Sequence, residues 1–333
     1  MTAILVLGGA GYIGSHACKS LALKGYTPIT YDDLSLGHES FVKWGPFVRG
    51  DIADTPRLIA TIREFSVVSV LHFAAVASVG ESVVDPAKYY AINVGGTISV
   101  LNALRTTDCK TIVFSSSCAV YGEPNVIPIA EDAPKNPINP YGRSKLFCEE
   151  MLTDYGAAFG IRSITLRYFN AAGASPEGEI GELRNPETHL IPRALMYLQG
   201  HATDFVVCGN DFSTPDGTAI RDYIHVTDLA EAHVLTMELL RAGHRSTSFN
   251  LGSGVGHSVR AVQSCIESVT GHALPQVVAA RRQGDPAALV ADPRKARMIM
   301  GFEATQSDLT NIVRTAWNWH QKAHPRAGLP NPT

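Results

Sequence analysis

The fold class is decided close to the N-terminus, by the stretch Ile4-Leu5-Val6-Leu7-Gly8-Gly9-Ala10-Gly11-Tyr12-Ile13-Gly14. Its apolar start is typical of a short strand buried on both faces of a parallel sheet, and a helix is expected to follow from about Ile13 to Lys24. Without side chains, Gly8 and Gly11 let the backbone approach a pyrophosphate. Gly14 lets the helix pack against the strand, and the helix N-terminus attracts phosphate. The stretch therefore predicts a dinucleotide-binding turn.

The end of the second expected strand indicates which dinucleotide binds. Asp32 follows the strand-like run Ile29 to Tyr31, at a distance from Gly14 where a carboxylate can accept hydrogen bonds from both ribose hydroxyls. Because a carboxylate there repels a 2′-phosphate, we predict NAD in preference to NADP. Asp51 and Ile52 are at a position that could contact the edge of the adenine, although the pair by itself indicates no more than a loop turn.

The chain alternates expected strands with expected helices through its first half. Further strands are predicted at 67–73, 111–114 and 163–166, with helices at 88–105 and 141–159. Such β-α-β units imply an α/β fold with a Rossmann-type doubly wound parallel sheet. After about residue 170 the alternation stops, and we expect a smaller mixed α/β lobe over the carboxyl ends of the sheet, where ligands bind. The Pro- and Gly-rich tail from Pro325 is expected to fray.

Composition excludes several classes of partner. The 333 residues are 45% hydrophobic and 18% charged, which is typical of a globular protein, and the net charge of −3 offers no positive field for nucleic acid. No apolar stretch reaches the length of a membrane span. The six cysteines form no CxxC pair and no secretory leader is visible, so we expect reduced thiols and a cytoplasmic protein. The twelve histidines are scattered without zinc-site spacing, so no metal is predicted.

A tyrosine and a lysine four residues apart carry the expected chemistry. Tyr141 and Lys145 share one face of a helix that begins near Pro140, and Ser117 ends the upstream strand with a hydroxyl. Tyrosine, with a pKa near 10, is a poor base at neutral pH, but a neighbouring ammonium and a nicotinamide cation both favour the phenolate. Tyr-x-x-x-Lys alone could be a solvated helix face. The glycine loop, the strand that ends in serine and the Tyr-x-x-x-Lys pair follow one another in this order along the chain. Together they predict proton transfer by Tyr141.

Three further motifs extend this pattern along the chain: Arg167-Tyr168-Phe169-Asn170, Arg221-Asp222-Tyr223-Ile224-His225-Val226 and Arg282-x-x-Asp285. With them, the chain from Gly8 to about His320 resembles the extended short-chain dehydrogenase/reductase family, and within it the C4 epimerases of UDP-galactose and UDP-glucose. The resemblance implies an isomerase with tightly bound NAD. Tyr141 would take the proton of the sugar's 4-hydroxyl, Ser117 would hydrogen-bond the same oxygen, and Lys145 would bind the nicotinamide ribose. Hydride would leave C4 and return to the other face of a 4-keto sugar.

The resemblance also assigns site residues, domains and assembly. It implies cofactor contacts at Gly8, Gly11, Tyr12, Ile13, Gly14, Asp32, Asp51, Ile52, Phe73, Ala74, Ala75, Asn93, Tyr141, Lys145 and Tyr168. It implies contacts to the UDP-sugar at Ser117, Tyr141, Asn170, His189, Leu190, Arg221, Arg282, Asp285 and Leu289. We expect 1–169 to bind NAD, a segment near 221–250 to return to that domain, and 170–333 to form mainly the nucleotide-sugar lobe. A homodimer through helices 88–105 and 141–159 is also expected.

The chain departs from the family pattern at positions that bear on the cofactor and the substrate. The segment 74–79 has no Lys or His where the family often has one, so one cofactor contact is expected to be missing. Cys208 stands at a position often aromatic, and His189 where an asparagine is common. Leu289 is intermediate between a restrictive tyrosine and a small residue that admits N-acetyl sugars. UDP-N-acetylhexosamines and the pentoses UDP-arabinose and UDP-xylose therefore remain alternatives.

Other enzyme and non-enzyme classes are less favoured. A sugar-nucleotide dehydratase needs an acid–base pair after Ser117, whereas this chain has Cys118-Ala119-Val120-Tyr121-Gly122 there. A net oxidoreductase would need an exchangeable cofactor. A non-catalytic NAD-sensing protein would not be expected to retain Tyr141, Lys145 and Ser117 together.

Overall fold

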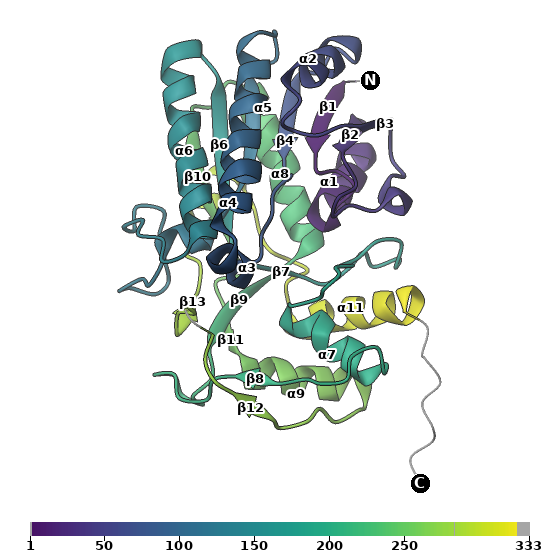
Figure 1. Ribbon diagram of the computed structural model, residues 1–333, viewed down its shortest axis with the longest axis vertical. Helices are drawn as coiled ribbons and strands as arrows, with labels where there is room; N and C mark the ends of the chain where they lie inside the picture. The colour runs from purple at the N-terminus through teal and green to yellow at the C-terminus, as the bar shows by residue number, and fades with distance from the viewer. Residues whose placement is uncertain (1, 283, 325–333) are drawn as a thin grey trace.

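A seven-stranded parallel sheet forms the centre of the larger part of the chain (Figure 1). The computed structural model describes residues 2–282 and 284–324, so the expected fraying of the tail from Pro325 lies outside the described residues. The sheet has the order β10-β6-β5-β4-β1-β2-β3. Its strands are β1 (Ala3–Leu7), β2 (Thr27–Asp32), β3 (Phe47–Arg49), β4 (Ser69–His72), β5 (Thr111–Ser117), β6 (Arg162–Tyr168) and β10 (Thr247–Leu251). The predicted doubly wound sheet is therefore confirmed.

Helices cover both faces of this sheet, which explains why β1 is apolar throughout. Leu5 and Leu7 belong to the core on one face, and Ile4 and Val6 belong to the core on the other. The first face packs against α2 (Thr55–Glu64), α5 (Gly96–Arg105) and α6 (Pro140–Phe159). The second packs against α1 (Tyr12–Leu23), α8 (Val226–Arg241) and α10 (Arg294–Met300).

The chain order in the sheet reverses beside β1. β1 pairs with β2 on one side and with β4 on the other, so the connections leave in opposite directions at this point. Ligands of open α/β sheets bind at such a switch point, outside the carboxyl ends of the strands. The later segment that contains α8 and β10 returns to the large sheet, where β10 pairs with β6.

A smaller mixed lobe lies beyond the carboxyl ends of the large sheet (Figure 1). Its strands are β7 (Asn170–Ala172), β9 (Ile220–His225), β11 (Gly256–Ser258) and β13 (Ala288–Leu289), with a separate pair β8 (Val207–Cys208) and β12 (Val278–Ala279). Its helices are α7 (Leu190–Leu198), α9 (Val259–Thr270) and α11 (Leu309–Ala323), which share one apolar core. The short elements η1 (Glu39–Phe41), α3 (Val79–Val84) and η3 (Cys118–Tyr121) complete the described structure.

Two elements differ from the expected bounds for physical reasons. The expected helix 88–105 consists of α4 (Pro86–Tyr89), a π-helical segment η2 (Tyr90–Gly95) and α5. The π segment carries Asn93, whose side chain bonds the backbone N and O of Val76 and the hydroxyl of Ser144, contacts that the local sequence does not reveal. β5 continues three residues beyond the expected end, because Ser115, Ser116 and Ser117 pair with β6.

The described helices and cysteines bear on two further expectations. Within residues 2–282 and 284–324, no helix combines the length and the apolar content that crossing a bilayer requires. All six cysteines are free, and four of them are buried.

Buried histidines give the fold a defined response to acid. Burial lowers the pKa of His16 and His72 to about 3, and that of His225, His233 and His320 to about 4. These side chains are neutral in the folded protein, whereas the unfolded chain takes up protons below about pH 6.5. The stabilisation is therefore complete above that pH and is lost as the pH falls toward 4. Each such histidine adds about 1.4 kcal/mol per pH unit to the slope of the unfolding free energy.

We predict that His225→Asn reduces this slope by about one proton between about pH 4.5 and 6.5. His225 caps α8 by accepting a hydrogen bond from Thr227 N at 3.1 Å, and asparagine can supply the same acceptor without titrating. Urea unfolding at a series of pH values measures the slope. His272→Asn, at an exposed position, is the matched control. Equal slopes for the two variants would contradict the assignment.

Candidate active site

The glycine-rich turn after β1 is shaped by backbone contacts that exclude side chains. A Cβ added at Gly8 would lie 2.6 Å from Ala74 N, and one added at Gly14 would lie 2.1 Å from Gly8 O. Gly8 also has a φ of 78°, which favours glycine. Gly11 caps α1, whose first turn contains no acidic side chain. The free N–H groups and the positive end of the helix dipole are therefore available to an anion.

A cavity of about 540 Å³ runs from this turn along the carboxyl ends of β1, β2 and β4. Asp32 lies in its wall, and its carboxylate accepts hydrogen bonds from Ala10 N at 3.0 Å and Leu34 N at 2.9 Å. The glycine turn, the helix N-terminus and this carboxylate fit the phosphates and the ribose of a dinucleotide. The expected cofactor residues in the lining are Gly8, Gly11, Asp32, Asp51, Ile52, Phe73, Ala74 and Ala75.

The other expected cofactor residues are not in this lining. Tyr12, Ile13 and Gly14 form the first turn of α1. Asn93 is buried outside the cavity wall, where its side chain joins Val76 to Ser144. Tyr141, Lys145 and Tyr168 lie in the next part of the site, beside β5 and β6.

The structure brings Tyr141, Lys145 and Ser117 together from two elements. Tyr141 and Lys145 are buried on the first turns of α6, and Ser117 ends β5. The Lys145 ammonium donates a hydrogen bond to Ser115 O at 2.9 Å. The Ser117 hydroxyl accepts a hydrogen bond from Ala119 N at 3.1 Å, and it lies near enough to the Tyr141 phenol to lower its pKa. The arrangement can pass a proton between a phenol and a bound hydroxyl.

Burial dominates the protonation of this group. Burial raises the pKa of Tyr141 to about 12, although Ser117 and the charge of Arg184 both lower it. Burial lowers the pKa of Lys145 to about 8, although electrostatic interactions with Cys148 and Glu149 raise it. In the protein by itself, desolvation outweighs the charges that surround the phenol, so a lowered pKa of Tyr141 in the presence of the nicotinamide cation stays a prediction.

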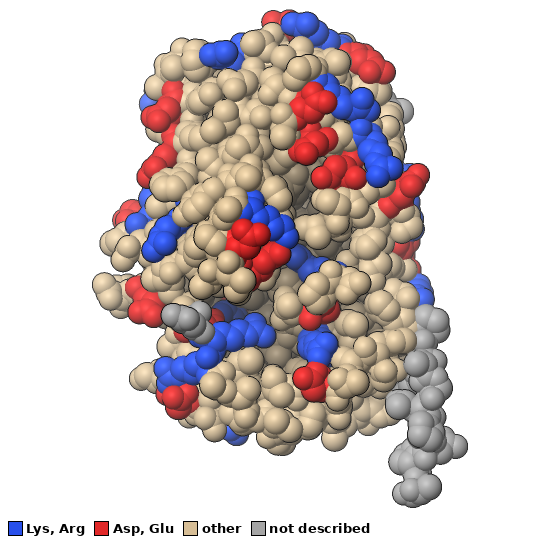
Figure 2. All heavy atoms as spheres, viewed as in Figure 1, with Lys and Arg blue, Asp and Glu red and all other residues tan. Residues whose placement is uncertain are grey.

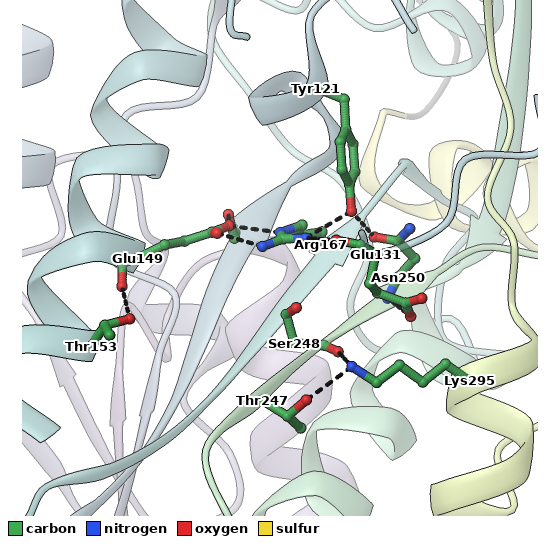
Figure 3. A network of polar contacts seen from close by, with 10 residues as sticks. Tyr121, Glu131, Glu149, Thr153, Arg167, Thr247, Ser248, Asn250 and Lys295 are labelled. Carbon is green, nitrogen blue, oxygen red and sulfur yellow. Dashed lines mark hydrogen bonds and ion pairs between the residues drawn. The ribbon is translucent and has the colours of Figure 1, made fainter. Parts of the chain in front are cut away.

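A buried carboxylate joins the helix of Tyr141 and Lys145 to the sheet (Figure 3). Glu149, one turn after Lys145, accepts from Ser116 Oγ at 2.6 Å on β5 and from Arg167 Nη2 at 2.7 Å on β6. Arg167 also donates to the hydroxyl of Tyr121 at 2.8 Å. The sequence analysis missed Glu149, although its spacing of four from Lys145 places it on the same helix face.

The expected substrate residues gather on the smaller lobe, beside this group. Arg221 on β9 forms an ion pair with Asp285, and Leu289 is its register partner on β13. Leu289 is buried in a cluster with Phe169, and Asn170 begins β7. Arg282, in contrast, is exposed in the segment between β12 and β13.

A second, much smaller cavity of about 40 Å³ contains Asn170, His189 and Leu190 in its wall. His189 Nδ1 lies 3.1 Å from Glu182 Oε1 and 3.2 Å from Glu187 Oε1. Burial lowers the pKa of His189, but the two carboxylates outweigh this effect and raise it to about 9.

The cluster around His189 was not expected from the sequence. Glu182, Glu187 and His189 present donor atoms within 4.8 Å of one another, a grouping that could hold a metal ion. Arg184 pairs with Glu182 at 2.9 Å, so two cations already balance the two carboxylates. We therefore describe the group as an ion-pair cluster. It lies in a loop, where no periodic pattern marks a residue as buried.

The two lobes enclose the site between them. Figure 2 shows a hollow between the larger part and the smaller lobe, with Lys and Arg atoms at its walls. The cofactor cavity and Tyr141 come from the larger part, while Arg221, His189 and Leu289 come from the smaller lobe.

Comparison with known proteins agrees with this geometry. Residues 4–252 match the NAD dependent epimerase/dehydratase family. The chain is 50% identical over 319 residues to a UDP-glucose 4-epimerase of Rhizobium meliloti (strain 1021), covering 96% of this chain and 97% of that protein.

Solved structures give the same result. A UDP-glucose 4-epimerase from Brucella ovis in complex with NAD superposes with a TM-score of 0.93 and 55% identity, covering 95% of this chain and 98% of that one. One from Bifidobacterium longum in complex with NAD+ and UDP gives 0.92 and 36%, covering 98% and 100%. The chain belongs to the NAD dependent epimerase/dehydratase family.

Proposed function

We propose that the protein interconverts UDP-galactose and UDP-glucose by reversible, NAD-dependent epimerisation at C4, through a transient 4-keto sugar. The observation that carries the proposal is the buried group of Tyr141, Ser117 and Lys145 at the junction of the dinucleotide cavity and the smaller lobe. Relatives at 44–50% identity over nearly the whole chain are UDP-glucose 4-epimerases, which supports this substrate over the pentose and N-acetyl alternatives.

Each residue of the proposed catalytic group has its own role in the proton transfer. NAD, when bound, would supply the hydride acceptor and donor for C4 and a positive charge beside the phenol. The phenolic oxygen of Tyr141 takes the proton of the 4-hydroxyl and gives it back, while Ser117 hydrogen-bonds the same oxygen. Because burial alone raises the pKa of Tyr141, positive charge is required before the phenol can act as a base. Lys145, on the same helix face one turn away, contributes to that charge and binds the nicotinamide ribose.

The remaining contacts in this proposal are those that the family resemblance implies. The turn Gly8 to Gly14 holds the cofactor phosphates, Asp32 the adenosine ribose, and Asp51 and Ile52 the adenine. Phe73, Ala74, Ala75, Asn93 and Tyr168 complete the cofactor site. Asn170, His189, Leu190, Arg221, Arg282 and Asp285 hold the uridine diphosphate, and Leu289 faces the sugar. In this division 1–169, with a returning segment near 221–250, binds NAD, and 170–333 mainly binds the nucleotide sugar.

The proposal includes a cytoplasmic homodimer. Exposed apolar side chains occur on the two helical segments expected to pair: Ile92, Ile98, Phe147 and Phe159 are each 37–45% exposed. Free cysteines support a reducing compartment.

We predict that the purified protein converts UDP-galactose to UDP-glucose without added NAD. Tightly held cofactor is regenerated in each cycle, so none needs to be supplied. The sugar product is assayed directly, with UDP-N-acetylgalactosamine and UDP-arabinose in parallel to test the restriction at Leu289. If the hexose is inert even after NAD is supplied while another sugar reacts, the substrate assignment is wrong.

We predict that Tyr141→Phe lowers the rate constant kcat by at least about 100-fold while NAD stays bound, because only the proton-carrying oxygen is removed. Turnover and the NAD content of the purified protein are the two measurements. Tyr155→Phe, on the same helix and away from the site, serves as the control. Surviving turnover in Tyr141→Phe would exclude the proposed proton transfer.

We predict that Glu149→Gln moves the alkaline decline of kcat to lower pH. Burial lowers the pKa of Lys145 to about 8, and Glu149 opposes this effect, so loss of its charge lowers that pKa further. The ammonium is therefore lost at a lower pH as the pH rises. Activity is measured as a function of pH, and the position of the decline does not depend on how much protein folds. Exposed Glu150→Gln is the matched control, and coincident profiles would contradict the role of Glu149.

A further inference from the structure

The cavity assigned to the dinucleotide contains little positive charge. The charged residues in its lining are Asp32, Asp33, Asp51 and Lys88, and Lys88 is paired with Glu81 at 2.6 Å. The segment 74–79, which crosses the cavity, contains no cation. Among the described lining residues, the glycine turn therefore faces a diphosphate without an uncommitted positive side chain.

A loop of the smaller lobe, residues 173–189, crosses to this turn. The Tyr12 hydroxyl donates a hydrogen bond to Gly173 O at 2.6 Å. His38 Nε2 lies 2.9 Å from Leu183 O, and His38 N donates to Ala10 O at 2.9 Å. One histidine thus connects the backbone of Leu183 to the glycine turn, and the residue after Leu183 is a cation, Arg184.

The side chain of Arg184 is oriented and has donors to spare. Its Nε donates to Glu182 Oε1 at 2.9 Å, and Trp319 Nε1 holds the Glu182 backbone by donating to its carbonyl at 3.0 Å. Within residues 2–282 and 284–324, Arg184 donates no other hydrogen bond, which leaves the Nη1 and Nη2 groups for a ligand. A planar guanidinium with several free N–H groups matches the oxygens of a diphosphate.

The charge of Arg184 acts on a tyrosine of the glycine turn, Tyr12, and on Tyr141. Burial raises the pKa of Tyr12, Tyr141 and Tyr168, and the charge of Arg184 opposes that rise in all three. Arg221, by contrast, acts on Cys118 and Tyr223. The two arginines therefore act on different side chains, and the backbone contacts of Gly173 and Leu183 bring the loop that carries Arg184 to the glycine turn.

We propose that Arg184, oriented by Glu182, binds the diphosphate of the bound dinucleotide from the smaller lobe. This inference rests on the proposed function only in taking NAD as the resident cofactor. It supplies from the smaller lobe the cation that the segment 74–79 lacks. It also makes retention of the cofactor depend on the smaller lobe.

The test compares Arg184→Gln with Arg193→Gln in the full chain. Arg193 is a matched control, because its side chain is also 35% exposed and also forms an ion pair, with Asp204. Exchange of labelled NAD is measured on the protein as purified. Affinities for ADP, AMP and UDP are measured after the bound nucleotide is removed. ADP contains the diphosphate and AMP does not, so the pair isolates the proposed contact.

We predict that Arg184→Gln speeds NAD exchange and weakens ADP binding by about tenfold or more, as expected for loss of a charge-assisted hydrogen bond. AMP and UDP binding should stay within about twofold of the wild type, and Arg184→Lys should be intermediate. Arg193→Gln should behave as the wild type.

Three results would overturn the assignment: unchanged NAD exchange and ADP binding, an equal loss of AMP binding, or a loss confined to UDP. The last would transfer Arg184 to the substrate's diphosphate. A wild-type protein that holds no NAD would instead contradict the proposed function itself, so the two failures are distinguishable.

Discussion

The position of the proposed catalytic group depends on one buried carboxylate, that of Glu149. It joins α6 to β5 through Ser116 and to β6 through Arg167, so the helix that carries Tyr141 and Lys145 keeps one position relative to the strand that ends in Ser117. Buried ion pairs add little net stability, because desolvation offsets their attraction. Alignment is therefore the better account of this pair, since proton transfer requires the phenol, the hydroxyl and the substrate oxygen within hydrogen-bond reach.

Burial and catalysis make opposite demands on that group. A dry site strengthens every electrostatic interaction, but it also disfavours the phenolate of Tyr141 and the ammonium of Lys145. The protein by itself therefore keeps the phenol protonated. The positive charge of a bound nicotinamide would favour the phenolate, so a base would form only where a hydride acceptor is also present. This coupling protects the site from unproductive proton transfer.

The parts of the fold and the site that could be predicted from the sequence are those whose residues lie close together in the chain. The glycine turn, Asp32 and the Tyr-x-x-x-Lys pair lie within one or two consecutive elements, so their spacing alone indicated their geometry. The π segment at Asn93 depends on contacts with Val76 and Ser144, which are distant in the chain. The cluster of Glu182, Arg184, Glu187 and His189 is local, but it lies in a loop where no periodic pattern marks a residue as buried. The rise in the pKa of Tyr141 in the protein by itself could not be predicted either, because it depends on how completely the fold excludes water, which residue spacing does not show.

The connection of the two lobes bears on why the cofactor is retained. The chain leaves the larger sheet after β6, returns with α8 and β10, and leaves again, and the 173–189 loop contacts the glycine turn from the smaller lobe. Release of a dinucleotide held by both lobes would require these contacts to separate. A net oxidoreductase could not tolerate that cost in every turnover, because its reduced cofactor must leave. An epimerase regenerates its cofactor in place, so an enclosure that slows release carries no penalty and keeps the reduced intermediate state from losing its hydride to solvent-borne acceptors.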